Sequence, residues 1–263
     1  MNAPRAEFLD AEPLVRFSGV DKVYANGTLA LKNLDLSVRP GEFVSLLGPS
    51  GCGKSTALRI VAALGHHSSG RVERPGEGAD ARGEIGFVFQ EPHLMPWGTV
   101  FDNVYLPLKL LGKSRAAAKA EVMAVLEMVG LSGFADSYPR ELSGGMRMRV
   151  SIARALVTRP RLLLMDEPFA ALDEITRNKL SRDLLSIWQA SGATIMFVTH
   201  SVYESVYLSS RIVVMAARPG RIIGELDIAE PYPRDEEFRL SPEYAAHCRE
   251  VSALLARAMN EAA

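Results

Sequence analysis

Eight consecutive residues have the spacing of a phosphate-binding loop. Residues 48–55 read Gly-Pro-Ser-Gly-Cys-Gly-Lys-Ser, between an apolar run and a helical run. In such a loop, glycines let backbone N–H groups point at a phosphate at the start of a helix. Lys54 is then expected to reach the β- and γ-phosphates, and the Ser55 hydroxyl to bind Mg²⁺. A plain glycine-rich turn fits the flanking strand and helix less well, and Thr56 stands where a dinucleotide loop needs Gly or Ala.

Two carboxylates follow a short apolar run further along the chain. Leu162 to Met165 lead directly into Asp166 and Glu167. The carboxyl end of a buried strand is where ligands bind in open α/β sheets. Asp166 suits Mg²⁺ coordination, and Glu167 suits a general base that activates water. A strand that stops at a solvated acidic turn is the alternative, and the phosphate-binding loop argues against it.

A second helix start carries a Ser-Gly-Gly sequence. Ser143, Gly144 and Gly145 precede the helical run from Arg147 to Val157. Taken alone, Ser143 is an N-cap and the glycines form an entry turn. Beside the first loop, the same residues predict a second anion site at a helix N-terminus. A head-to-tail pair of chains would close both sites on one ATP.

The flanking patterns predict the elements that position these residues. Short strands with turns are expected over 14–47, and a helix over 55–64. Residues 71–90 hold a loose Gly-rich stretch and then an expected strand from Glu84 to Gln90, and 100–157 are expected to be mainly helical. The apolar runs at 161–165 and 194–199 suit buried parallel strands, with a helix over 174–190 between them. Ser241 and Pro242 predict the start of a final helix.

We therefore predict an α/β P-loop NTPase fold with a mostly parallel core sheet. A small antiparallel β subdomain and an all-helical insertion, at about 91–156, complete this prediction. The expected domains are an ATPase domain over residues 1–220 and a C-terminal tail with a terminal helix over residues 221–263.

Composition narrows the function classes. Lys and Arg total 30 and Asp and Glu total 31, so no global basic field attracts nucleic acid. No apolar run reaches the roughly 18 residues of a membrane span. The segment from Met1 to Glu12 lacks the apolar region of a secretory signal, and two cysteines make no disulfide framework. These features fit a reducing cytosol best.

The order of these features resembles that of the ABC ATPase family. The resemblance covers roughly residues 14–220 and rests on the loop at 48–55, Gln90, residues 142–145, residues 166–167, residues 171–173 and His200. It implies ATP and Mg²⁺ as ligands, with Ser55, Gln90 and Asp166 at the metal. The implied nucleotide contacts are Tyr24, Gly48, Pro49, Ser50, Gly51, Cys52, Gly53, Lys54, Ser55, Thr56, Gln90, Ser143, Gly144, Gly145 and Asp173.

The resemblance also implies individual roles. Tyr24 stacks on adenine, although a half-buried strand aromatic is the alternative. Glu167 and His200 are the catalytic pair, with His200 at the γ-phosphate, although a lone His at a strand end is often structural. Gln90 senses the γ-phosphate, and Asp173 lies at the dimer seam. Three positions depart from the common family pattern: Met146 and Met148 replace Gln, and Ala63 stands where Gly is frequent.

Residues 90–97 narrow the resemblance to a group of importers. Gln90-Glu91-Pro92 and Leu94 to Trp97 are similar to a stretch of nitrate, sulfonate and taurine importers. Importers of pyrimidines, riboflavin or aromatic acids share it, and Trp97 alone is explained by packing. The implied partners are a second copy or a paralogous cassette, transmembrane permease subunits and an extracytoplasmic solute-binding protein. No nucleic acid partner is expected.

Three other functions remain as alternatives. A soluble ABC ATPase for translation or repair usually carries two cassettes or a long coiled-coil insertion, and this chain has neither. Another P-loop kinase or switch leaves residues 142–146 and His200 unexplained. An exporter cassette stays open, because partners outside this chain set the direction of transport.

Overall fold

The computed structural model describes residues 11–76 and 83–260 of the 263-residue chain. The chain divides into two compact units: unit 1 comprises Met1–Pro75 and Thr194–Ala263, and unit 2 comprises Gly76–Ala193. Parts of two expectations lie outside the described residues, namely the N-terminal segment to residue 10 and residues 77–82 of the Gly-rich stretch. Among the described helices, none has the length and apolar character needed to cross a membrane.

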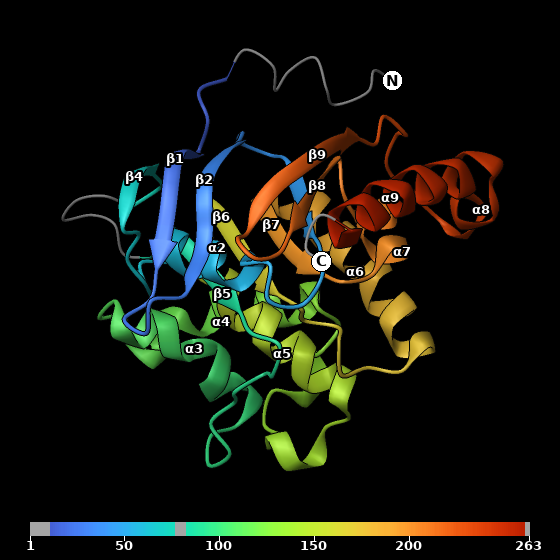
Figure 1. The fold of residues 1–263 in the computed structure, drawn as a ribbon. Coiled ribbons are helices and arrows are strands. Elements are labelled where there is room, and N and C mark those ends of the chain that lie inside the picture. Colours follow the sequence, from blue (N-terminus) through green and yellow to red (C-terminus); the bar gives the residue numbers. More distant parts are fainter. Residues whose placement is uncertain (1–10, 77–82, 261–263) are drawn as a thin grey trace. The chain divides into compact units, whose positions relative to one another are not determined.

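Unit 1 contains a small antiparallel sheet with the strand order β2-β1-β4 (Figure 1). Its strands are β1 (Val15–Val23), β2 (Leu29–Val38) and β4 (Ser69–Glu73). Phe17 of β1 lies opposite Leu36 of β2 and Val72 of β4. The buried residues of β1 alternate with exposed ones, as expected for a sheet with one face on the core.

The other strands of unit 1 are mostly parallel to one another. β3 (Phe43–Leu47) lies between β7 (Thr194–Thr199) and β8 (Arg211–Ala216) and is parallel to both. β9 (Arg221–Asp227) pairs with β8 in the antiparallel direction. Every residue of β3, β7 and β8 is buried, which explains their continuous apolar sequences.

The described residues of unit 1 include four helices: α2 (Lys54–Val61), α7 (Val202–Leu208), α8 (Glu236–Leu240) and α9 (Pro242–Asn260). α9 begins at the predicted position, and the Ser241 hydroxyl accepts a hydrogen bond from the Tyr244 N–H group at 3.1 Å. α2 ends three residues earlier than predicted, because Ala63 takes a left-handed conformation with φ 60°. The sequence there lacks the glycine that usually marks such a stop.

The described residues of unit 2 combine two parallel strands with four α-helices. β5 (Ile85–Val88) pairs with β6 (Leu162–Asp166). The helices are α3 (Val100–Leu110), α4 (Arg115–Met128), α5 (Gly144–Leu156) and α6 (Glu174–Ser191), with short 3₁₀ turns η1 (Ser132–Phe134) and η2 (Pro139–Glu141). β5 is shorter than the expected strand from Glu84 to Gln90. The predicted fold class, a mostly parallel α/β fold with a small antiparallel sheet and helices, is confirmed.

Candidate active site

The phosphate-binding loop connects β3 to α2 in unit 1. Gly51 and Gly53 have φ angles of 79° and 90°, a left-handed conformation that glycine adopts without steric cost. Gly53 is the N-cap of α2 and supplies no side-chain hydrogen bond to the first turn. The N–H groups of a first helical turn have no intrahelical acceptor, so this end of α2 is suited to an anion.

Two glycines allow neighbouring segments to press against this loop. A Cβ atom on Gly48 would lie 2.4 Å from the carbonyl oxygen of Met215 in β8. A Cβ atom on Gly220, which precedes β9, would lie 2.3 Å from the carbonyl oxygen of Cys52. Neither position has room for a side chain, so β8 and the β8–β9 turn pack directly against the phosphate-binding loop. Sequence reasoning missed Gly220, because nothing near it in the chain indicates this contact.

Lys54 is buried inside the loop. Its side-chain nitrogen donates hydrogen bonds to the carbonyl oxygens of Gly48 at 2.8 Å and Pro49 at 3.1 Å. An ammonium group held by neutral carbonyls in a buried site gains from a nearby anion. Burial raises the pKa of the adjacent Cys52 thiol, so this cysteine is a neutral filler of the loop.

Tyr24 is tied to the same region of unit 1. Its side chain is 41% exposed and lies in the turn between β1 and β2. The Tyr24 hydroxyl and the Thr56 hydroxyl of α2 form a hydrogen bond at 3.0 Å. The ring is therefore held beside the start of α2 with accessible surface, which suits the predicted stacking on adenine.

His200 lies between β7 and α7, and its side chain is exposed. The residues on both sides of it are fixed: the Thr199 hydroxyl is hydrogen-bonded to the Glu204 carboxylate and accepts from the Ser201 N–H group at 3.0 Å. The Ser201 hydroxyl in turn accepts from the Glu204 N–H group at 3.3 Å. His200 is thus presented on a well-ordered strand-to-helix turn.

The acid pair lies at the end of β6 in unit 2. Asp166 is the last residue of the strand, and Glu167 follows with φ 48°. A left-handed conformation in a residue other than glycine costs about 1–3 kcal/mol and is concentrated at functional sites. This backbone strain at Glu167 is consistent with its predicted catalytic role.

Ser143 is the N-cap of α5, while the second anion site expected at Ser143, Gly144 and Gly145 remains a prediction. Its hydroxyl accepts a hydrogen bond from the Met146 N–H group at 3.3 Å. Gly144 and Gly145 open the helix, and a Cβ atom on Gly145 would lie 2.8 Å from the Thr176 methyl group of α6. Ser143 is exposed, Gly144 is half-buried and Gly145 is buried, so the start of α5 reaches the surface at its N-cap residue.

Gln90 and Asp173 are the remaining predicted residues of unit 2, and both are exposed. Asp173 is the N-cap of α6, where its carboxylate accepts from the Thr176 N–H group at 2.9 Å, and this hydrogen bond lowers the pKa of Asp173. Gln90 is followed by a segment held by Arg154 of α5, which donates to the carbonyl oxygens of Pro92 and His93, each at 2.8 Å. Sequence reasoning did not single out Arg154.

The predicted magnesium ligands have suitable chemistry. Ser55, Gln90 and Asp166 offer only oxygen donors, which hard cations such as Mg²⁺ prefer. Over residues 11–76 and 83–260, no group of three or more His, Cys, Asp or Glu side chains could hold a metal ion.

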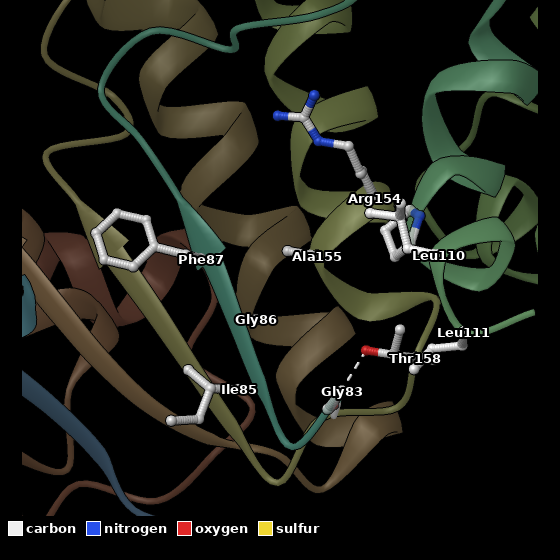
Figure 2. A pocket seen from close by; sticks show the side chains of 10 residues that line it. Gly83, Ile85, Gly86, Phe87, Leu110, Leu111, Arg154, Ala155 and Thr158 are labelled. Atoms are coloured by element: carbon white, nitrogen blue, oxygen red, sulfur yellow. Dashed lines mark hydrogen bonds between the residues drawn. The ribbon is translucent and has the colours of Figure 1, made fainter. Parts of the chain in front are cut away.

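Unit 2 also contains a pocket beside β5, with a volume of about 470 Å³ (Figure 2). Leu110 and Leu111 at the end of α3 line it and are 74% and 38% exposed. β5 and α5 touch closely there, since a Cβ atom on Gly86 would lie 2.6 Å from the Ala155 carbonyl oxygen. Figure 2 also shows the hydrogen bond from the Thr158 hydroxyl to the Gly83 carbonyl oxygen, at 3.1 Å.

The structure thus distributes the predicted residues over two groups. Unit 1 brings Tyr24 and Thr56 into contact at the phosphate-binding loop, and it carries His200. Unit 2 carries Gln90, residues 143–145, the acid pair and Asp173. The individual roles of these residues remain predictions.

Known proteins are similar to this chain in sequence. The family model described as ABC transporter matches residues 31–170. An uncharacterised ABC transporter ATP-binding protein of Methanocaldococcus jannaschii is 48% identical over 235 residues, covering 88% of this chain and 85% of that protein. The aliphatic sulfonates import ATP-binding protein SsuB of Bacillus subtilis is 46% identical over 217 residues, covering 82% and 83%.

Solved structures that are similar to this chain come from the same family. CbiO1 from Clostridium perfringens, described as part of an ABC transporter complex, aligns with a TM-score of 0.76 and 26% identity, covering 94% of this chain and 97% of that chain. A dimeric ATP-binding cassette in a post-hydrolysis state, bound to ADP and Pi, aligns with a TM-score of 0.71 and 35% identity, covering 82% and 99%. The chain therefore belongs to the ABC transporter family, as one of its ATPase cassettes.

Proposed function

We propose that this chain powers an ABC importer of a small anion of the nitrate, sulfonate or taurine type. The observation that carries the proposal is the similarity to proteins named for aliphatic sulfonate import. One such protein, SsuB 1 of Pseudomonas savastanoi, is 48% identical over 218 residues, which are 82% of this chain. The residues at 90–97 that resemble this group support the same assignment.

The nucleotide is held from unit 1 in this proposal. The start of α2 and Lys54 bind the β- and γ-phosphates, because the loop presents N–H donors and a buried ammonium group. Tyr24 covers the adenine from its place beside Thr56. Tight packing behind Gly48 keeps the loop in a binding geometry before ATP arrives, so little ordering is needed on binding.

Hydrolysis is assigned to the predicted metal-binding and catalytic residues. Ser55, Gln90 and Asp166 would hold Mg²⁺, which would offset the charge of the phosphates. Glu167 accepts the proton of the attacking water, and His200 orients the γ-phosphate. The strained backbone of Glu167 and the ordered turn at His200 support these assignments.

A second copy, or a paralogous cassette, completes each site. In the proposed head-to-tail dimer, Ser143, Gly144 and Gly145 of one copy contact the γ-phosphate held by the other, and Asp173 lies at the seam. The exposed Ser143 at the start of α5 supports this arrangement. Further support comes from the solved relative that is described as dimeric and bound to ADP and Pi.

Membrane subunits are the partners that convert hydrolysis into transport. We place the cassette at the cytoplasmic face of the cell membrane, with permease subunits and a solute-binding protein, and without nucleic acid. A cytoplasmic loop of the permease docks in the pocket beside β5, where Leu110 offers exposed apolar surface. The ATPase domain spans residues 1–220 in this proposal, and residues 221–263 form a tail.

Copurification from the native host tests this function. The chain is tagged, extracted gently in detergent, and its companions are identified by mass spectrometry. A multi-span permease supports the transporter, while only soluble partners across several detergents contradict it. Uptake of labelled taurine, an alkanesulfonate and nitrate is then compared between the wild type and a Glu167→Gln strain. Uptake that the variant leaves intact for all three solutes rejects the anion-importer assignment.

A further inference from the structure

The tail, residues 221–263, packs against α7, the helix that begins next to His200. In Figure 1, α9 lies beside α7, and the Tyr244 hydroxyl of α9 donates to the Tyr203 carbonyl oxygen at 3.0 Å. The segment between β9 and α8 carries Tyr232 and Arg234. Arg234 is only 3% exposed, although arginine is among the residues that are least often buried.

The Arg234 guanidinium makes five hydrogen bonds to carbonyl oxygens. One terminal nitrogen donates to Val206 at 2.9 Å, Tyr207 at 3.1 Å and Ser209 at 2.9 Å. The other donates to Ile228 and Glu230, each at 3.1 Å. The same side chain thus joins the end of α7 to the start of the tail.

Side chains of the tail donate hydrogen bonds to most of the carbonyl groups at the C-terminal end of α7. The last four carbonyl groups of a helix have no intrahelical partner. Arg234 serves those of Val206 and Tyr207, and the Tyr232 hydroxyl donates to that of Leu208 at 2.9 Å. The Tyr207 hydroxyl donates back to the Arg234 carbonyl oxygen at 2.8 Å, so the connection runs in both directions.

The other end of α7 carries the predicted catalytic histidine. His200 is followed by Ser201, the N-cap of α7, and the Glu204 side chain in the first turn is bonded to Thr199. A helix of seven residues is only about 10 Å long and moves as one body. A shift at its C-terminal end therefore reaches the turn that presents His200.

The hydrogen bonds of Arg234 to α7 and to the tail are expected to form together or not at all. Burial lowers the pKa of Arg234, because the charged form loses its hydration. Its bonds offset that cost only while the carbonyls of α7 and the tail are both in place. The rings of Tyr232 and Phe238, with centroids 4.2 Å and 5.3 Å from the guanidinium carbon, enclose it further.

We propose that Arg234 is a positioning residue for ATP hydrolysis, which fixes α7 from the tail and thereby holds His200 in its working orientation. The proposal rests on the role proposed above for His200. Arg234 does not touch the nucleotide; it acts through α7. The tail is then part of the hydrolytic machinery and not a mere cap of the fold.

Steady-state ATPase assays of the complete transporter test this role. Arg234→Ala is expected to lower kcat on the order of 10²-fold, the scale of a small misplacement of a catalytic group, and to leave KM for ATP nearly unchanged. Arg234→Lys restores part of kcat, because an ammonium group serves only some of the carbonyls. Arg257→Ala, an exposed arginine of α9, serves as the control and leaves both constants unchanged.

A double-mutant cycle with His200→Ala separates positioning from general damage. Single-turnover rates are measured well below the melting temperature of each variant. If Arg234 acts through His200, adding Arg234→Ala to His200→Ala lowers the rate little further. An equal fall in both backgrounds, or a wild-type kcat in Arg234→Ala, overturns the proposal. Full activity in His200→Ala alone instead refutes the role of His200, which is a distinct outcome.

Tyr232→Phe guards against a variant that fails to fold. It removes only the hydroxyl group that donates to the Leu208 carbonyl oxygen. We expect kcat to fall by less than in Arg234→Ala, again with KM for ATP retained. An unchanged kcat in this folded variant, together with an unfolded Arg234→Ala, argues against the tail as a positioning element.

Discussion

The side-chain nitrogen of Lys54 lies 2.8 Å from the carbonyl oxygen of Gly48, so this lysine is bonded to the first residue of its own loop. The ammonium group is therefore in place before any phosphate binds. Exchange of this contact for a charged phosphate adds a hydrogen bond in which both groups are ionised. Binding energy and loop geometry thus depend on the same side chain.

Replacement of Lys54 by alanine tests this dependence. A hydrogen bond to a charged group contributes about 1.5–3 kcal/mol, so ATP affinity is expected to fall roughly tenfold or more. Isothermal titration of purified protein measures the change. Arg59→Ala, an exposed cation on the same helix, is the matched control. Equal affinities of Lys54→Ala and wild type contradict a phosphate-binding role for Lys54.

Glu167→Gln separates chemistry from binding. The amide cannot accept the proton of water, so hydrolysis is expected to fall by roughly 10²–10⁴-fold, while ATP binding persists. Phosphate release under saturating ATP gives the rate, and titration gives the affinity. Glu174→Gln, an exposed acid in the first turn of α6, should hydrolyse ATP at the wild-type rate. Wild-type hydrolysis in Glu167→Gln disproves the general-base assignment.

The features that could be predicted from the sequence are those that depend on residues close together in the chain. The phosphate-binding loop, the apolar strands and the cap at Ser241 each depend on a few neighbouring residues, and the fold class followed from their order. The contacts of Arg234 with Val206 and of Gly220 with Cys52 join distant parts of the chain. No local pattern encodes such contacts, so the tail's connection to α7 became visible only in three dimensions.

The end of α2 shows why a boundary was misjudged. Ala63 has φ 60°, and the N–H group of Leu64 bonds back to the Arg59 carbonyl oxygen at 2.8 Å. Glycine is the usual residue at such a stop, because a Cβ atom is strained there. Alanine favours helix in the sequence and hides the end of α2.

Ala63→Gly should therefore stabilise the protein. Relief of the left-handed strain outweighs the extra freedom of glycine in the unfolded chain, for a gain of about 0.5–1 kcal/mol. Urea unfolding measures the free energy of unfolding. Ala62→Gly is the control, since Ala62 has φ −71° and should lose about 0.5–1 kcal/mol on replacement. A loss of stability in Ala63→Gly rejects the explanation by strain.

Gly220→Ala tests the support behind the phosphate-binding loop. The new methyl group would meet the Cys52 carbonyl oxygen at 2.3 Å and that of Ala30 at 2.7 Å. Overpacking of this kind costs about 1–3 kcal/mol, and displacement of the loop should weaken ATP binding. Thermal unfolding and ATP titration report the two effects. Gly133→Ala, which adds a methyl group in open space, should change neither. Unaltered binding in Gly220→Ala shows that this contact does not set the loop geometry.

Leu110→Arg tests the pocket beside β5 as the docking place of the permease. Leu110 is 74% exposed, so the free cassette should fold and hydrolyse ATP normally. In the complex, the charge enters an apolar contact without a partner, so permease copurification and solute uptake should both fall. Met259→Arg, a substitution of an exposed apolar residue on α9, controls for an added surface charge. If Leu110→Arg retains the permease and wild-type uptake, the pocket is not the docking place, and the membrane subunits must contact another surface of the cassette.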